Sequence, residues 1–135
     1  MRLQDKVILI TGSTTGIGKA IALKCVQEGA KVVIHGLEEN LGNEVLAILG
    51  KDNATLLIDD LANEDAAGHL VSLAIERFGK LDAVVNNAAL VISSNIDTTD
   101  LPLFRKVMEV NMLAPYHLIQ TALPYLIQQK GCVLN

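Results

Sequence analysis

Aromatic side chains are scarce in this sequence of 135 residues. Tryptophan is absent, and the aromatic residues are Phe78, Phe104, Tyr116 and Tyr125. A hydrophobic core must therefore be aliphatic, and 50% of the residues are hydrophobic. Such a composition is typical of the parallel sheet of an α/β protein, whose strands are covered on both faces. The length is sufficient for one domain with a substantial core.

A basic surplus and a long apolar run are also missing. Eleven Lys and Arg against fifteen Asp and Glu give a net charge of −4, which argues against a nucleic-acid binder. No run approaches the roughly 20 apolar residues of a membrane helix, and residues 1–6 lack the layout of a signal peptide. Cys25 and Cys132 form no CxxC pair, and no metal-ligand cluster is visible. We therefore expect a cytoplasmic protein with two reduced core thiols and no metal, nucleic-acid or membrane partner.

Short apolar runs alternate with segments whose apolar residues recur at helical spacing. This alternation predicts a parallel sheet with right-handed crossovers. No linker or low-complexity tract divides the chain, so residues 1–135 are expected to form one domain. Asn63 is the expected N-cap of the third helix. The expected strands are residues 6–11, 31–35, 54–59, 82–86 and 132–134, and the longest helix runs from about residue 101 to residue 129.

A glycine-rich segment, TGSTTGIG at residues 11–18, follows the first expected strand and opens the first helix. Gly12 permits a sharp turn, Gly16 lets a diphosphate approach the backbone, and Gly18 lets the helix pack closely. The helix N-terminus offers free N–H groups and partial positive charge to phosphates. The common G-x-G-x-x-G spacing is replaced by G-x-x-x-G-x-G. In this context the segment predicts nucleotide binding, the alternative being glycines that merely end a strand.

The spacing of these glycines resembles the short-chain dehydrogenase/reductase family, and further segments match it in the right order. Residues 86–89 read Asn-Asn-Ala-Ala where the family typically has Asn-Asn-Ala-Gly, and Asp60 and Leu61 follow the third strand. Asn111 lies in the long helix where the family carries a catalytic Asn. Residues 131–135 look like the fifth strand, which leads to the catalytic serine. The resemblance indicates the N-terminal, cofactor-binding portion of such an enzyme.

The resemblance implies a Rossmann-like, doubly wound sheet with strand order 3-2-1-4-5, lacking the later strands, and a bound nicotinamide dinucleotide. Asn86 is expected to be structural, and the methyl group of Ala89 is expected to crowd the cleft where the family has glycine. The residues expected at the cofactor site are Gly12, Ser13, Thr15, Gly16, Ile17 and Gly18 around the diphosphate, Gly36 and Leu37 after the second strand, Asp60 and Leu61 at the adenine, Asn87 and Ala88 beside the ribose, and Ala89.

The choice between NAD and NADP depends on the end of the second strand. An acidic residue there accepts hydrogen bonds from the ribose 2′-OH of NAD, whereas an arginine pairs with the 2′-phosphate of NADP. Gly36 and Leu37 are neither, and Thr15 stands where NADP-preferring relatives often carry a basic residue. The missing cation favours NAD, while NADP remains open. Glu38 either reaches the ribose or, as favoured, serves the first turn of a helix, and His35 is a candidate partner of a phosphate.

Asn111 is the candidate catalytic residue. Pro115, four positions later, has no N–H for the Asn111 carbonyl, and its ring pushes that carbonyl aside. The sequence therefore predicts a kink with a freed carbonyl. By the resemblance, this carbonyl holds a water in a proton relay to the active-site lysine. The alternative is an ordinary polar residue on a helix face.

The family's catalytic serine and Tyr-x-x-x-Lys pair are absent from these 135 residues. Gln120 and Gln129 follow Tyr116 and Tyr125 where a lysine would be needed, so neither tyrosine has the cation that prepares it to move a proton. We expect the NAD(P)(H)-binding part of an oxidoreductase that interconverts an alcohol and a carbonyl, inactive alone. The alternative is a non-catalytic nucleotide-binding or interaction module. A small-molecule substrate requires the C-terminal half, and by resemblance the long helix packs on its counterpart in a homo-oligomer.

Overall fold

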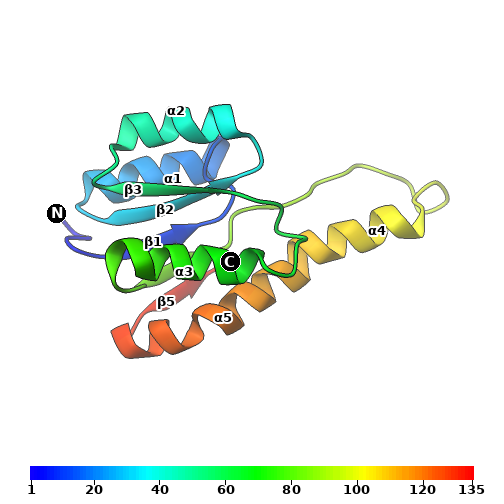
Figure 1. Ribbon diagram of the computed structural model, residues 1–135. Helices are drawn as coiled ribbons and strands as arrows, with labels where there is room; N and C mark the ends of the chain where they lie inside the picture. The colour runs from blue at the N-terminus through cyan, green and yellow to red at the C-terminus, as the bar shows by residue number, and fades with distance from the viewer.

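A computed structural model describes residues 1–135. Its centre is a five-stranded parallel sheet in the order β3-β2-β1-β4-β5, as predicted (Figure 1). From β1 the chain first builds outward to β3 and then crosses to β4 and β5 on the other side, so the winding reverses between β1 and β4. The strands are β1 (Val7–Ile10), β2 (Lys31–Gly36), β3 (Ala54–Ile58), β4 (Ala83–Val85) and β5 (Cys132–Leu134).

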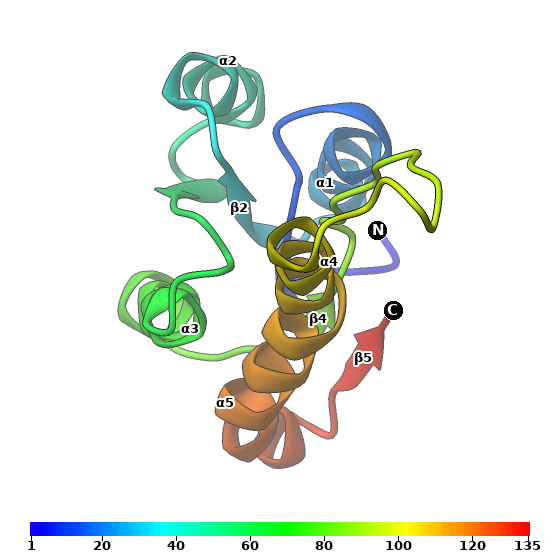
Figure 2. The same cartoon turned by 90° about the vertical axis from the view of Figure 1, so that its right-hand side faces the viewer.

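Helices cover both faces of this sheet. They are α1 (Gly16–Gln27), α2 (Glu39–Leu49), α3 (Ala66–Phe78), α4 (Leu101–Met108) and α5 (Ala114–Gln129). The pair α1 and α2 packs on one face, and the pair α3 and α5 packs on the other (Figure 1 and Figure 2). No helix combines the length and the apolar character needed to cross a bilayer.

The strand β1 contributes to both cores because its side chains alternate. Val7 and Leu9 pack with α3 and α5, whereas Ile8 and Ile10 pack with α1 and α2. Every buried hydrophobic residue is Ala, Val, Ile, Leu or Cys. The aliphatic core predicted from the shortage of aromatics is therefore present on both faces.

The long helix is interrupted by a π-helical turn. Residues Glu109–Leu113 form this turn, η1, between α4 and α5. The N–H of Ala114 donates to the carbonyl of Glu109, five positions back, and Pro115 has no N–H for the carbonyl of Asn111. The widened turn gives the proline ring room. The interruption predicted at this proline is thus present, and it takes the form of a π turn.

Two local predictions are wrong. Asn63 does not cap α3, since the helix begins at Ala66 with Asp65 as its N-cap, and the Asn63 side-chain amide donates to Asp59 Oδ1 at 2.8 Å. Cys25 is a core thiol as expected, and burial raises its pKa. Cys132 is instead exposed, since it lies on β5 at the edge of the sheet.

One buried carboxylate anchors the amino ends of three strands. Asp82, directly before β4, accepts hydrogen bonds from Val7 N–H and Lys6 Nζ, both at 2.9 Å, and Lys80 Nζ lies 3.0 Å from it. Its main chain bonds to Val7 and to Cys132. Burial alone would raise the pKa of Asp82, but the bonds from Val7, Lys6 and Lys80 outweigh burial and hold the pKa below its usual 3.8. This anchor fixes β1, β4 and β5 relative to one another.

Candidate functional site

A cleft of about 420 Å³ opens at the carboxyl ends of the strands, where the winding reverses between β1 and β4. In doubly wound sheets, ligands bind in this crevice. The predicted cofactor residues from the glycine turn and from the ends of β2, β3 and β4 meet here. The lining consists of Gly12, Thr14, Thr15, His35, Gly36, Leu37, Glu38, Leu41, Asp60, Leu61, Asn87, Ala88, Ala89, Leu90, Lys106 and Val110.

The turn after β1 has glycine at three positions, and two of these glycines, Gly12 and Gly16, have a positive φ. Gly12 has a φ of +61°, and a Cβ there would lie 2.9 Å from Ala88 Cα. At Gly18, where α1 passes the turn, a Cβ would collide with the Gly12 carbonyl oxygen and lie 2.5 Å from Asn87 Nδ2. Gly16 differs, since no atom lies within 4 Å of its Cβ position. The turn is therefore tightly packed at Gly12 and Gly18 and open at Gly16.

The beginning of α1 presents unpaired donors. Thr15 is the N-cap but makes no side-chain capping bond, and the first turn contains no acidic residue. Because the first N–H groups of a helix have no partner within it, those of Gly16, Ile17 and Gly18 have no acceptor in the protein. Thr15 lines the cleft, whereas the three residues that follow it do not. The arrangement suits an anionic group.

Ser13 does not reach the cleft, contrary to prediction. Its hydroxyl donates to the Ile10 carbonyl at 2.7 Å and accepts from His35 N–H at 3.0 Å. Its own N–H donates to the His35 carbonyl at 2.8 Å. Ser13 is fully buried, so its side chain and its N–H bind the turn to β2 and are not available to a ligand.

His35 is also engaged on both sides of its ring. Its Nδ1 accepts from Gly12 N–H at 3.1 Å, and its Nε2 lies 2.9 Å from the Asp59 carbonyl, to which it donates. This pattern requires a neutral imidazole protonated on Nε2. Burial lowers the pKa of His35, and the opposing effects of Asp59 and Asp60 do not offset it. The prediction that His35 pairs with a phosphate is therefore wrong.

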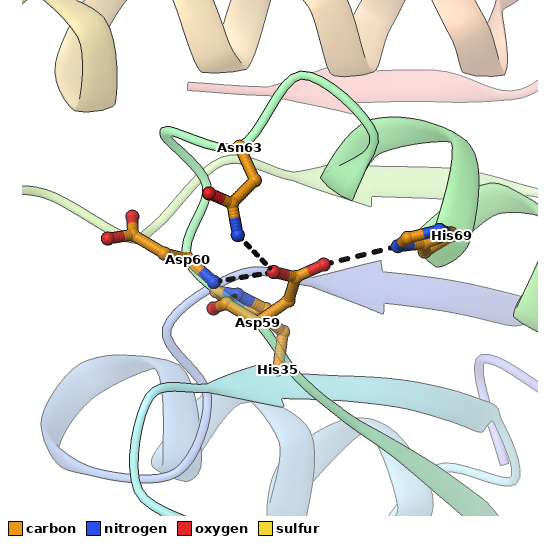
Figure 3. A network of polar contacts seen from close by, with 5 residues as sticks. All are labelled: His35, Asp59, Asp60, Asn63 and His69. Atoms are coloured by element: carbon orange, nitrogen blue, oxygen red, sulfur yellow. Dashed lines mark hydrogen bonds and ion pairs between the residues drawn. The ribbon is translucent and has the colours of Figure 1, made fainter.

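Asp59 organises the segment after β3 (Figure 3). One of its oxygens accepts from Asp60 N–H and from Asn63 Nδ2, both at 2.8 Å, and the other lies 3.2 Å from His69 Nδ1. Burial would raise the pKa of Asp59, but Asn63, His69 and Asp60 N–H outweigh burial and keep it below 3.8. His69 on α3 thus has a carboxylate partner. The Asp60 side chain points away from this network (Figure 3) and, with Leu61, lines the cleft.

The end of β4 is joined to the glycine turn by hydrogen bonds. Asn87 Nδ2 donates to the carbonyls of Thr11 at 3.0 Å and Gly12 at 2.9 Å. Thr11 Oγ1 accepts from the N–H groups of Asn87 at 3.1 Å and Ala88 at 3.0 Å. These bonds hold Asn87, Ala88 and Ala89 along the cleft wall. The Asn87 side-chain amide donates both of its hydrogen bonds to main-chain carbonyls of the protein.

The end of β2 explains why position 36 is glycine. A Cβ on Gly36 would collide with Thr14 Oγ1 and lie 2.5 Å from Thr14 Cγ2, so an acidic side chain does not fit there unless Thr14 moves. Leu37 is 67% exposed at the cleft. Glu38 is the N-cap of α2 but makes no side-chain capping bond, and it lines the cleft. The favoured expectation that Glu38 serves the helix is therefore not supported.

Lys106 is a cleft residue that sequence reasoning missed. It comes from α4 and lines the cleft together with Val110 and the acidic Glu38 and Asp60. Nothing in the local sequence distinguishes Lys106 from an ordinary solvated helix residue; only the fold brings α4 to the strand ends. No group of three or more His, Cys, Asp or Glu residues is placed to hold a metal ion.

Asn111 fastens the π turn to the segment after β4. Its Oδ1 accepts from Leu90 N–H at 2.7 Å, and its Nδ2 donates to the Leu90 carbonyl at 2.9 Å. A second cavity of about 470 Å³ adjoins Asn111 and Asn86. Asn86 Nδ2 donates to Asn135 Oδ1 at 2.7 Å, and its own Oδ1 is buried without a partner. Asn111 thus lines the second cavity and is bonded through its side chain to Leu90, which lines the first.

A parallel sheet with a glycine turn, an open helix N-terminus and a cleft at the reversal of winding defines a Rossmann-like fold. Residues 6–135 match the family described as short chain dehydrogenase. The chain therefore belongs to the short-chain dehydrogenase family, as its motifs indicated.

Similar proteins extend beyond this chain. It is 37% identical over 136 residues to an uncharacterized oxidoreductase of Thermotoga maritima, a match that covers 99% of this chain and 53% of that relative. It is 33% identical over 135 residues to an uncharacterized oxidoreductase of Staphylococcus epidermidis, a match that covers 99% of this chain and 58% of that relative. A crystal structure described as a short-chain dehydrogenase/reductase, glucose/ribitol dehydrogenase, from Brucella melitensis matches with a TM-score of 0.89 at 27% identity, covering 93% of this chain and 54% of that one. The chain thus spans about half the length of the curated relatives it matches.

Proposed function

We propose that these residues bind a nicotinamide dinucleotide in the cleft. The observation that carries this proposal is the set of unpaired N–H groups at residues 16–18, next to the open backbone of Gly16. They would hold the diphosphate. Asp60 and Leu61 would border the adenine, and residues 87–89 would run beside the ribose. The cleft wall at residues 87 and 88 is held by hydrogen bonds that involve the Thr11 hydroxyl and the Asn87 side-chain amide, which suits a site of fixed shape.

We further propose that the whole protein interconverts an alcohol and a carbonyl. When bound, the dinucleotide supplies or accepts the hydride, while the protein orients it and handles the proton. Here Asn111, with no N–H from Pro115 for its main-chain carbonyl, is the candidate catalytic residue, and its side chain is held by Leu90. Substrate recognition and proton transfer at the substrate oxygen are assigned to parts of the protein outside these residues.

The experiment that tests both statements compares the 135-residue chain with the full-length protein. Both should bind NADH, seen as a change in NADH fluorescence, and only the full-length protein should consume NADH when simple ketones are added. Failure of both chains to bind NADH would contradict the cofactor site. Turnover by the 135 residues alone would contradict the assignment of proton transfer to other residues.

We propose that the cleft prefers NAD to NADP because its lining carries Glu38 and Asp60 against the single cation Lys106. Glu38 would accept hydrogen bonds from the ribose 2′-OH and repel a 2′-phosphate. We expect NADH to bind about tenfold more tightly than NADPH, the effect of one charge-assisted hydrogen bond of roughly 1.5 kcal/mol. Glu38→Gln should narrow this ratio, and adding Leu37→Arg should reverse it.

The matched control for this titration is Glu39→Gln. Glu39 lies in the first turn of α2 and is not part of the cleft lining, so this variant should keep the native preference. Tighter binding of NADPH than NADH by the unaltered protein would contradict the assignment to NAD.

We also propose that the protein self-associates through the helical rod of α4, η1 and α5. Large apolar side chains remain exposed along it, and apolar surface of this kind commonly marks a protein interface. Sedimentation should show a dimer or larger species that Phe104→Ser with Tyr116→Ser dissociates, and a native monomer at every concentration would contradict the proposal. The exposed residues include Leu101 at 66%, Phe104 at 54%, Met112 at 58%, Tyr116 at 64% and Ile127 at 68%.

A further inference from the structure

His35 joins the ends of three neighbouring strands through its ring and main chain. It belongs to β2, and its ring reaches Gly12 after β1 on one side and Asp59 after β3 on the other. Its main-chain N–H and carbonyl both bond to Ser13. The side chain is 2% exposed, although it borders the cleft. No other side chain accepts the Gly12 N–H.

We infer that His35 is the positioning residue of the dinucleotide site: its unprotonated Nδ1 holds the glycine turn in its binding shape, and a proton on Nδ1 releases that turn and weakens dinucleotide binding. The inference rests on the proposed dinucleotide binding and adds a control by acid. His35 touches no part of the proposed ligand and acts through Gly12.

The link from Gly12 to the ligand runs through the packing of the turn. The Gly12 carbonyl accepts from Asn87 Nδ2 at 2.9 Å and lies against Gly18, where even a methyl group does not fit. A displacement of Gly12 therefore moves the beginning of α1. The N–H groups proposed to hold the diphosphate are at that helix end, so their position depends on the bond to His35.

Protonation of the ring removes this bond for a simple reason. A proton on Nδ1 would face the Gly12 N–H, and two donors cannot bond to each other. The charged groups that border the same cleft are Asp60 after β3, Glu38 before α2 and Lys106 on α4, and Asp59 adjoins the ring through its main-chain carbonyl. None of them accepts from Nδ1. His69 reaches the ring only through Asp59, as Figure 3 shows.

The direction of the pH effect follows from the buried ring. Burial lowers the pKa of His35 below 6.5, and Asp59 and Asp60 only partly oppose this. A group whose pKa is lowered on folding contributes stability above its ordinary pKa and loses it as the pH falls. The site is therefore formed at neutral pH and is lost as the pH falls through the lowered pKa of the folded protein's His35.

The test compares two variants that each retain one side of the imidazole. In His35→Asn, the side-chain oxygen takes the place of Nδ1 and accepts from Gly12 without titrating. In His35→Gln, the amide takes the place of Nε2 and donates to Asp59, leaving the Gly12 N–H unpaired. NADH affinity is measured between about pH 5 and pH 8, where histidine changes charge. NADH is the suitable probe because it lacks the phosphate monoester of NADPH, which titrates near pH 6.

Below the pKa of His35 in the free protein, the native affinity for NADH should fall by about tenfold for each pH unit. His35→Asn should bind NADH at pH 8 like the native protein, within about threefold, and show a flat profile. His35→Gln should bind at least about tenfold more weakly at every pH. His117→Asn, on the exposed side of α5, is the control and should keep the native profile. A native profile as flat as that of His35→Asn overturns the inference.

A second measurement needs no cofactor. The Gly12 amide resonance of the free protein should shift with pH, together with the His35 ring nitrogens, and should not shift in His35→Asn. A Gly12 resonance that does not shift with pH overturns the inference, independently of the result of the NADH titration. This holds even if His35→Gln does not fold. Absence of NADH binding at every pH, with Gly12 still titrating, overturns the proposed function and retains the role of His35 in the turn.

Discussion

Replacing Gly18 with alanine is expected to abolish detectable NADH binding and to destabilise the protein. A Cβ at this position would collide with the Gly12 carbonyl oxygen and lie 2.5 Å from Asn87 Nδ2. The first contact is with backbone, which cannot rotate away, so either the turn or α1 must move. Overpacking of this kind costs about 1–3 kcal/mol of stability. The N–H groups proposed to hold the diphosphate move with α1, so binding suffers more than folding does.

The control for this variant is Gly68→Ala in α3. No atom lies within 4 Å of the Cβ position of Gly68, and alanine is the better helix former. This change should raise stability by about 0.5–1 kcal/mol and leave NADH binding unaltered. Urea denaturation and NADH titration of both variants make the comparison. Native affinity in Gly18→Ala would show that the close approach of α1 to the turn is irrelevant to the site.

The second large effect is expected for Asp82→Asn, at the opposite end of the sheet. The amide has the shape of the carboxylate but no charge for Lys6 and Lys80, and one of its two polar atoms becomes a donor facing donors. The side chain of Asp82 is 5% exposed, and breaking a buried, charged network typically costs about 3 kcal/mol or more. Denaturation at neutral pH should show this loss, while NADH binding by the folded fraction persists.

The pH dependence of Asp82→Asn provides a check on its cause. The pKa of Asp82 is below 3.8 in the folded protein, so its contribution is present above pH 3.8 and is lost as the pH falls below that value. The difference between native protein and variant should therefore shrink in acid. Asp52→Asn, at an exposed side chain without polar partners, should match the native protein throughout. Equal stability of Asp82→Asn and the native protein at neutral pH would contradict the role of the Asp82 carboxylate as an anchor of the strands.

The strand order and the position of the glycine turn could be predicted because both depend on local pattern. An apolar run such as the one in residues 31–35 needs cover on both faces, and right-handed crossovers leave few ways to arrange alternating strands and helices. The ends of elements were less predictable. Asn63 has the residue type of an N-cap, but α3 begins only at Ala66, and the Asn63 amide bonds to Asp59 after the end of β3.

The parts of the site that could not be predicted depend on partners distant in the sequence. The bond between Gly12 and His35 joins positions 23 residues apart, and that between Val7 and Asp82 joins positions 75 apart. Neither pair has a spacing that distinguishes it from chance. Ser13 shows the same difficulty, because a serine in a phosphate-binding loop has the same sequence signature whether its hydroxyl faces a ligand or, as here, Ile10.

The paired hydrogen bonds between Asn111 and Leu90 connect two surfaces with different proposed tasks. One is the helical rod on which subunits would meet, and the other is the wall on which the ribose would lie. Because two hydrogen bonds join Asn111 directly to Leu90, a shift of one surface would be transmitted to the other. Assembly and NADH binding would then be coupled reciprocally. If bound NADH multiplies the association constant of the subunits by some factor, association multiplies the affinity for NADH by the same factor.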